Sequence, residues 1–178
     1  PRLADIAQAV YQAVASLGDL RPQLAGKRVA ITAGSRGISG IQPFLAALAA
    51  CLSELGARPF FVPAMGSHGG ATAEGQLSLL AGLGLTEHSL GAPLYASMDT
   101  LELGRLANGM PVYMDALAAQ ADAIVIANRI KPHTDFSGEF ESGLAKMVVI
   151  GLGKLQGADT LHRYGVQGLR DLVPEAAR

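Results

Sequence analysis

One stretch of the chain, residues 128–153, holds most of the side chains that could act on a small molecule. Arg129, Lys131, His133 and Asp135 closely follow an apolar run, DAIVIA, that is typical of a buried strand. Open α/β sheets place their ligand sites just beyond the carboxyl ends of such strands. The sequence therefore predicts a binding or catalytic site in the loop that begins at residue 128.

The four histidines of the chain are not equivalent. His68 lies in a glycine-rich loop after the second predicted strand, and His133 follows a proline in the loop after the third. Imidazole exchanges a proton near neutral pH, so a facing pair could serve as acid and base on opposite faces of one substrate. A packed or surface role is the alternative for either histidine alone. We expect His88 at the surface, and His162 lies in a further predicted helix.

Lys146 is the one lysine inside the apolar segment ESGLAKMVVIGLG, which is predicted to be a helix that ends in glycine. Burial of an ammonium group is costly unless the group is paired, neutralised or used covalently. Two hypotheses stay open for this residue. It could be an amine made nucleophilic by desolvation, or a side chain that reaches water from the edge of an apolar helix.

A glycine-rich loop, AGSRGISG (33–40), follows the first predicted strand and contains Gly34, Ser35, Arg36 and Gly37. Backbone amides at a helix start together with an arginine favour a phosphate or carboxylate, and the alternative is a solvated loop. The loop also looks like the TGxxxGxG motif of short-chain dehydrogenases. However, no acidic residue follows the second strand to bind a ribose, and no tyrosine has a lysine four positions later.

Alternating strands and helices must position these residues. Strands are predicted at 27–32, 58–63 and 122–127, helices at 41–56 and 73–84, and a hairpin around Asn108-Gly109. This order is typical of an α/β fold, here a Rossmann-like, mainly parallel sheet with helices on both faces. The loops at the carboxyl ends of the strands, 33–40, 63–72 and 128–140, are then expected at one edge of the sheet.

The composition favours a single globular domain over residues 1–178, because 49% of the residues are hydrophobic and only 16% are charged. A net charge of −1 without a basic patch argues against nucleic acid as a partner. The single cysteine, the lack of a membrane-spanning run and the lack of signal-peptide features predict a cytoplasmic protein. The last ten residues form a helical pattern without a closing strand, so we expect a further, C-terminal domain outside this chain.

These motifs resemble the N-terminal domain of the nickel-pincer lactate racemase family. The resemblance covers roughly residues 30–164 and is most specific around His68, in GSHGGATAEGQ, and around His133 and Lys146, in NRIKPHTDFSGEFESGLAKMVVIGLGK. His162 follows at matching spacing. The family implies an α/β cofactor domain and a second domain that closes over the substrate.

The resemblance also implies a role for each candidate residue. His68 and His133 would be the two acid/base groups. Lys146 would form a thioamide link to a nickel-pincer nucleotide, a pyridinium mononucleotide that carries nickel in an S-C-S pincer, and His162 would complete the nickel coordination. Arg36 would lie near the cofactor phosphate and the substrate. The nickel-pincer nucleotide is thus the expected cofactor, and a 2-hydroxy acid is the expected substrate.

The implied reaction is racemisation or epimerisation at the carbon that bears the hydroxyl group. A base removes the hydroxyl proton while hydride passes to the pincer carbon, and return of hydride to the other face of the planar 2-keto acid inverts the centre. The chain departs from the lactate enzymes at Ala33, where they usually have an acidic residue, and in a longer segment between His133 and Lys146. Both departures leave the identity of the 2-hydroxy acid open.

Two other functions are compatible with the same residues. A nickel- or cofactor-binding module without turnover would keep Lys146 and the histidines but lack a competent substrate pocket. A zinc hydrolase with three histidine ligands is less favoured, because the sequence has no HExxH or similar pair of ligands on a helix.

Overall fold

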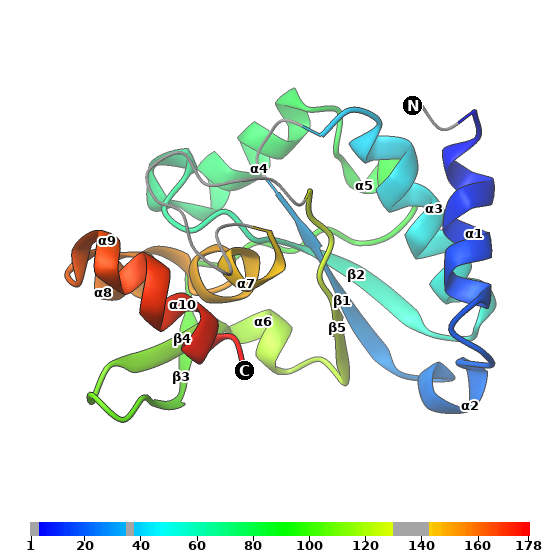
Figure 1. Cartoon of the computed structure of the whole chain (residues 1–178). Coiled ribbons are helices and arrows are strands. Elements are labelled where there is room, and N and C mark those ends of the chain that lie inside the picture. Colours follow the sequence, from blue (N-terminus) through cyan, green and yellow to red (C-terminus); the bar gives the residue numbers. More distant parts are fainter. Residues whose placement is uncertain (1–3, 35–37, 130–142) are drawn as a thin grey trace.

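A computed structural model describes residues 4–34, 38–129 and 143–178 of the chain. Its centre is a parallel sheet of three strands, β1 (Arg28–Ala33), β2 (Arg58–Pro63) and β5 (Ala123–Val125), in the order β2-β1-β5 (Figure 1). The middle strand β1 is buried from its second residue onward and pairs with β2 along its whole length. The predicted α/β class and the three predicted strands are therefore confirmed.

Each face of the sheet has its own apolar core, because successive residues of a strand point to opposite sides. On one face, alternate residues of β1 pack with α3 (Ile41–Glu54), whose outer side is covered by α1 (Ile6–Ala15) (Figure 1). On the other face, the intervening residues of β1 and β2 pack with α6 (Ala116–Ala119) and with η2 (Met147–Gly151). Helical segments thus cover both faces in the described part of the chain.

The predicted helices at 41–56 and 73–84 are confirmed as α3 and α4 (Ala73–Gly82). Thr72 caps α4, because its hydroxyl oxygen accepts a hydrogen bond from the backbone N–H of Gly75 at 3.0 Å. The remaining short helices are α2 (Arg21–Leu24), η1 (Gly69–Ala71), α5 (Glu87–Leu90), α9 (Gly165–Gln167), η3 (Gly168–Leu172) and α10 (Val173–Ala176). No helix among the described residues combines the length and the apolar character needed to cross a membrane.

β5 is shorter than the predicted strand 122–127, because a side chain replaces part of the strand pairing. The backbone N–H of Ala127 donates to the Thr32 hydroxyl oxygen at 2.8 Å, and this hydroxyl donates to Ala127 O at 3.4 Å. Thr32 is fully buried in β1, so water does not compete for this bond. The chain therefore leaves the regular sheet just before residue 128, where the predicted site begins.

Replacing Thr32 with valine tests this use of a side chain in place of strand pairing. Valine has nearly the same shape but no hydroxyl, so the buried N–H of Ala127 loses its acceptor. We expect the free energy of unfolding, measured by urea denaturation, to fall by about 1–3 kcal/mol. Thr32→Ser keeps the hydroxyl and should cost less; equal costs for the two variants would mean that the methyl group, not the hydrogen bond, matters.

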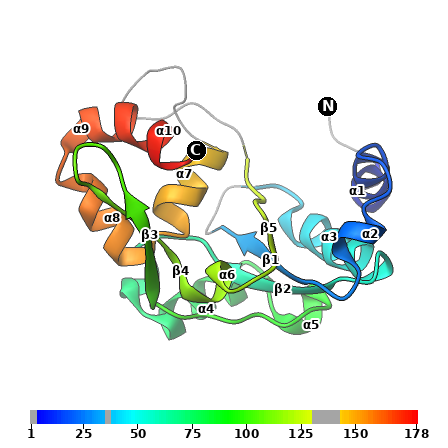
Figure 2. The same ribbon diagram turned by 90° about the horizontal axis from the view of Figure 1, so that it is seen from below.

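The predicted hairpin is confirmed as β3 (Thr100–Arg105) and β4 (Pro111–Asp115), with Gly109 in the turn at φ +83°. It forms a separate antiparallel sheet and is not part of the parallel sheet. β4 lies alongside α8 (Lys154–His162) (Figure 2). The hairpin is joined to the end of η2 through the N–H of Asp115, which donates at 2.7 Å to the carbonyl oxygen of Leu152, the residue that follows η2. The hairpin therefore supports the helices that follow residue 143.

The apolar segment after residue 143 is helical, as predicted, but it is not one regular α-helix. A short turn, α7 (Leu144–Lys146), continues into η2, which is π-helical, and α8 begins after Gly153. Gly151 has no room for a Cβ, because that atom would lie 2.7 Å from Ala64 O. A glycine at this position therefore lets η2 lie directly against the chain that leaves β2. Single π-turns of this kind are frequent at functional sites.

The carboxyl ends of β1, β2 and β5 lie at one edge of the sheet, because the three strands are parallel. The chain segments that leave this edge are those in which the three functional loops were predicted. Of these, residues 33–34, 38–40, 63–72 and 128–129 belong to the described part of the chain.

Candidate functional site

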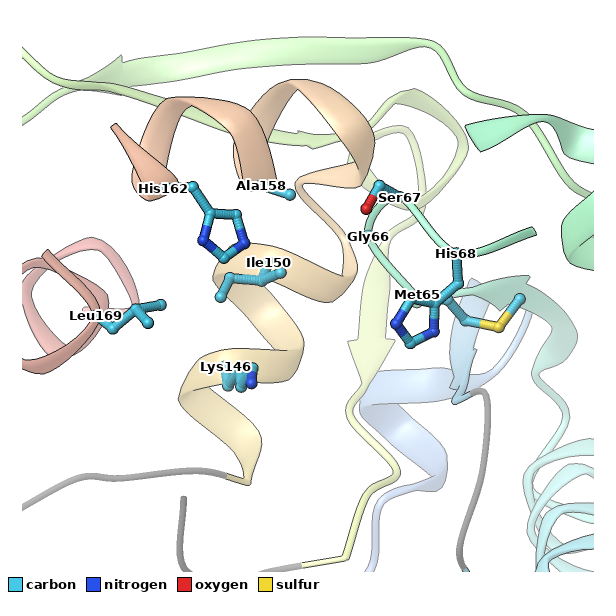
Figure 3. Close-up of a pocket in the computed structure, with 9 residues that line it drawn as sticks. All are labelled: Met65, Gly66, Ser67, His68, Lys146, Ile150, Ala158, His162 and Leu169. Carbon is cyan, nitrogen blue, oxygen red and sulfur yellow. The ribbon is translucent and has the colours of Figure 1, made fainter. Parts of the chain in front are cut away.

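A cavity of about 170 Å³ lies beyond the carboxyl end of β2 and brings together three of the predicted residues, His68, Lys146 and His162 (Figure 3). His68 enters from the loop after β2, whereas Lys146 and His162 enter from the helical segment on the other side. The other lining residues are Met65, Gly66, Ser67, Ile150, Ala158 and Leu169. Residues that are far apart in the sequence thus meet in one small space.

Helical spacing explains why Lys146 and His162 share this cavity. Residues four positions apart lie on the same face of a helix. Lys146 and Ile150 form one such pair, and Ala158 and His162 on α8 form the other. Lys146 is half-buried, and His162 is exposed. The lysine is therefore less enclosed than its apolar sequence neighbours suggest, and it lies where a ligand could reach its amine.

The loop that carries His68 is fixed by its own backbone groups. The N–H of Gly66 donates to Gly151 O at 3.1 Å, and the N–H of His68 donates to Met65 O at 3.2 Å. From α4, the fully buried side-chain amide of Gln76 donates to Gly66 O at 2.9 Å and to His68 O at 3.3 Å. The backbone of His68 is therefore held, while its side chain is exposed at the cavity.

Two glycines allow this loop to fold back onto α4. Gly69 has φ +69°, a left-handed conformation that glycine adopts without strain. A Cβ added to Gly75, in the first turn of α4, would overlap Gly69 O. The GSHGG motif therefore turns tightly over the start of the helix, which places His68 at the cavity.

We expect Gly75→Ala to lower the free energy of unfolding by about 1–3 kcal/mol, because the new methyl group meets backbone that cannot move freely. Gly82→Ala at the other end of α4 is the matched control, since a Cβ there meets nothing within 4 Å. That variant should be neutral or stabilising by up to about 1 kcal/mol. Thermal unfolding followed by circular dichroism compares the two, and equal effects would contradict the close packing.

The sequence analysis missed Lys154, which is the fully buried lysine of this region. Its ammonium group lies 2.9 Å from Asp115 Oδ2, and both side chains have no exposed surface. It donates to Pro63 O at 2.6 Å and to Gln76 Oε1 at 3.3 Å. Burial lowers the pKa of Lys154, while the carboxylate of Asp115 acts in the opposite direction. Lys154 does not line the cavity.

Asp115 is held from two sides. Its Oδ1 accepts a hydrogen bond from the N–H of Ala118 at 2.8 Å and so caps α6. Its Oδ2 has the Lys154 ammonium as a charge partner, but among the described residues no donor is aligned on it for a hydrogen bond. The contact between the two residues is therefore an ion pair, shielded from water. No local signal in the sequence links two residues so far apart in the chain.

The other predicted site residues fall largely outside the described part of the chain. His133, Ser35, Arg36 and Gly37 belong to the segments 35–37 and 130–142. Gly34 is described, and a Cβ added to it would lie 3.1 Å from the end of the Met147 side chain, next in sequence to Lys146. The beginning of the AGSRGISG loop is therefore close to the helix that carries the candidate lysine.

Asn128 and Gly143, which lie on the two sides of the segment that contains His133, contact each other. The side-chain amide of Asn128 donates to Gly143 O at 3.0 Å, so the chain on the two sides of residues 130–142 is joined. Gly143 immediately precedes α7, which bears Lys146. His88, by contrast, lies exposed in α5 and does not line the cavity, in agreement with the expected surface position.

The described residues contain no group of three or more His, Cys, Asp or Glu side chains that could hold a metal ion. What the cavity does offer is one imidazole, from His162, close to one primary amine, from Lys146, and one further imidazole, from His68. Imidazole nitrogens are ligands that nickel and zinc both accept, so the described part of the cavity could contribute one or two ligands to a metal.

Residues 24–169, most of the chain, match the family described as "Lactate racemase N-terminal domain". The match includes β1, β2, β5 and all the residues that line the cavity. A comparison with curated proteins found no match.

Proposed function

The chain belongs to the lactate racemase N-terminal domain family, and on this premise we propose that it is the cofactor-bearing domain of a 2-hydroxy acid racemase or epimerase. The observation that carries the proposal is the meeting of His68, Lys146 and His162 in one cavity. An acid/base group, an amine for covalent attachment and a metal ligand are the three functions that such an enzyme needs from its protein. We also propose that the parallel sheet β2-β1-β5, with helical segments on both faces, is the core of a Rossmann-like fold.

The residues present fit a nickel-pincer nucleotide. Lys146 would hold it through its amine, and His162 would provide an imidazole to the nickel. The cavity of about 170 Å³ is smaller than the roughly 300 Å³ at which pockets for drug-sized ligands begin, so it suits the reacting end of the cofactor only.

The phosphate end of the nucleotide is assigned to the loop 33–40. Gly34, Ser35 and Gly37 would offer backbone N–H groups, and Arg36 would offer a charged fork for the phosphate. Gly34 lies against Met147, so this loop starts beside the Lys146 helix. One nucleotide could therefore extend from the loop to the cavity.

When bound, the cofactor supplies an acceptor for the hydride at the carbon that bears the hydroxyl group. His68 removes the hydroxyl proton of one stereoisomer, and its exposed side chain can then exchange this proton with water. The opposite stereoisomer presents its hydroxyl from the other side, which is the role proposed for His133. A C-terminal domain outside this chain and the 2-hydroxy acid itself are the proposed partners.

The alternative function, a nickel- or cofactor-binding module without turnover, requires Lys146 and His162 but not His68. His68→Ala therefore discriminates between the two functions, because it should abolish turnover in an enzyme and leave cofactor loading unchanged in either case. The experiment uses protein produced together with the enzymes that synthesise the cofactor. A loaded parent protein that includes the C-terminal domain and converts no 2-hydroxy acid would favour the binding module.

His162→Ala tests the proposed nickel ligand. We expect the variant to keep the cofactor mass on Lys146 while its nickel content falls about tenfold or more, the usual scale for loss of a group that holds a metal. Intact mass spectrometry and elemental analysis measure the two quantities on the same sample. His88→Ala is the matched control and should retain about one nickel per chain, as expected for a site with one imidazole ligand. Full nickel retention in His162→Ala would remove His162 from the coordination sphere.

A further inference from the structure

Two fully buried polar side chains, Lys154 and Gln76, contact each other near the cavity without lining it. Lys154 is the first residue of α8, the helix that ends at His162. Gln76 lies in α4 and reaches the loop that carries His68. They thus connect two of the three segments that bring functional side chains to the cavity.

The ammonium of Lys154 dictates how Gln76 is oriented. An ammonium group has only donors, so the atom of the Gln76 amide that faces it must be the oxygen, at 3.3 Å. The amide nitrogen then faces the opposite way, toward Gly66 O and His68 O. With the amide reversed, the amide nitrogen would face the ammonium, donor against donor, and the amide oxygen would face two carbonyl oxygens. The Lys154 ammonium at one end and the two loop carbonyls at the other therefore favour the same orientation, the one in which Gln76 binds the His68 loop.

The same ammonium also binds the chain just before this loop. Pro63 O, the last carbonyl of β2, accepts from Lys154 at 2.6 Å, and Asp115 balances the charge at 2.9 Å. Lys154 has φ +55°, an unusual conformation for a residue other than glycine. A lysine thus occupies an unusual backbone conformation at a position from which its side chain reaches all three partners.

We propose that Lys154 is a positioning residue, which acts through the Gln76 amide to hold the His68 loop at a fixed distance from the helices that carry Lys146 and His162. The effect on catalysis rests on the proposed function, whereas the positioning of the His68 loop does not. Lys154 and Gln76 touch neither substrate nor cofactor in this account. They act by fixing the position of His68 at the cavity.

Gln76→Met tests the second step of this connection. Methionine has similar length but cannot donate to Gly66 O or His68 O. We expect the backbone amide of Gly66 to exchange with deuterium about tenfold faster or more, on the order of the loss of a buried hydrogen bond. The imidazole signals of His68, assigned with His68→Ala, should also shift in the NMR spectrum.

Gln42→Met is the matched control, because the Gln42 side-chain amide also donates to a backbone carbonyl, Ser89 O, at 2.6 Å, but away from the cavity. It should leave the exchange of Gly66 and the signals of His68 unchanged. If both glutamine variants accelerated exchange at Gly66 equally, the effect would be general destabilisation and the proposal would be overturned. It would equally be overturned if Gln76→Met changed neither readout.

The double variant Lys154→Met/Asp115→Asn tests the first step without leaving a buried charge unpaired. The cap on the N–H of Ala118 is kept, since the amide oxygen of the introduced asparagine can accept the same bond. If Lys154 orients Gln76, then the folded double variant shows faster Gly66 exchange and shifted His68 signals, as Gln76→Met does. If Lys154 only neutralises Asp115, then the double variant matches the parent protein at both positions, and the positioning role is wrong.

Turnover provides a further test, because a purely structural role for Gln76 would not lower kcat selectively relative to KM. In the loaded enzyme, Gln76→Met should lower kcat for 2-hydroxy acid interconversion about tenfold or more with little change in KM, because a displaced base acts in the transition state. A parent protein without turnover would contradict the proposed function, while the NMR readouts would still decide the positioning role. Loss of positioning and loss of the proposed function are thus separable.

Discussion

Lys146→Arg is expected to abolish both the covalent cofactor adduct and the interconversion of 2-hydroxy acids, while the fold stays intact. Arginine keeps the charge and the length of the side chain, and Lys146 is only half-buried, so the change costs little stability. The guanidinium group stays protonated and is a poor nucleophile, so it cannot replace the amine. Activity should fall by on the order of a thousandfold or more, because the group that carries the difficult chemistry is lost.

Intact mass spectrometry, circular dichroism and a chiral assay check the three parts of this expectation. Lys27→Arg is the matched control, since Lys27 is an exposed lysine just before β1, outside the cavity. It should keep the adduct and the activity. A Lys146→Arg variant that still interconverts stereoisomers at the parental rate, or that carries the adduct on another lysine, would overturn the assignment of Lys146.

Lys154→Met is expected to have the largest effect on stability, a loss of about 3–5 kcal/mol in the free energy of unfolding. The methionine fills similar space, but Asp115 is left as a buried carboxylate without its partner at 2.9 Å. Pro63 O and Gln76 Oε1 also lose a donor. Urea denaturation of the folded fraction measures the change.

Lys27→Met provides the contrast for this prediction. Lys27 pairs with Asp122 at 3.4 Å, but the two side chains are 52% and 41% exposed, so water can replace the partner. An exposed pair of this kind contributes about 1 kcal/mol or less. Adding Asp115→Asn to Lys154→Met should recover much of the lost stability, because the uncompensated charge disappears. If Lys154→Met and Lys27→Met lowered the free energy of unfolding equally, then burial would not make the Lys154–Asp115 pair more costly to break.

Much of the scaffold could be predicted because its signals are local. Apolar runs mark β1 and β2, helical spacing marks α3 and α4, and glycine after asparagine marks the turn of the hairpin. The three strand ends could then be placed at one edge by the rules for parallel sheets. His68, Lys146 and His162 were expected together on the basis of the family resemblance, and the cavity brings them together.

The features that the sequence did not reveal depend on partners that are distant in the chain. β5 is short because Thr32, on another strand, binds the N–H of Ala127. The π-helical turn η2 accompanies the close packing of Gly151 against the carbonyl of Ala64. The sequence around Lys154 gives no sign that its side chain is buried. Its burial is explained by the ion pair with Asp115, which is distant in the chain. Local periodicity carries no information about such pairs.

The central claim is that this chain supports stereoinversion of a 2-hydroxy acid through hydride transfer. The most direct measurement incubates the cofactor-loaded full-length protein, with its C-terminal domain, in D₂O with single enantiomers of 2-hydroxy acids such as lactate, 2-hydroxybutyrate and malate, followed by chiral chromatography with mass detection. We expect one of these acids to yield its opposite enantiomer with the original hydrogen retained at C2, because hydride leaves and returns without mixing with water. Deuterium at C2 of the product, or no interconversion of any 2-hydroxy acid by fully loaded protein that includes the C-terminal domain, would contradict hydride transfer by this protein.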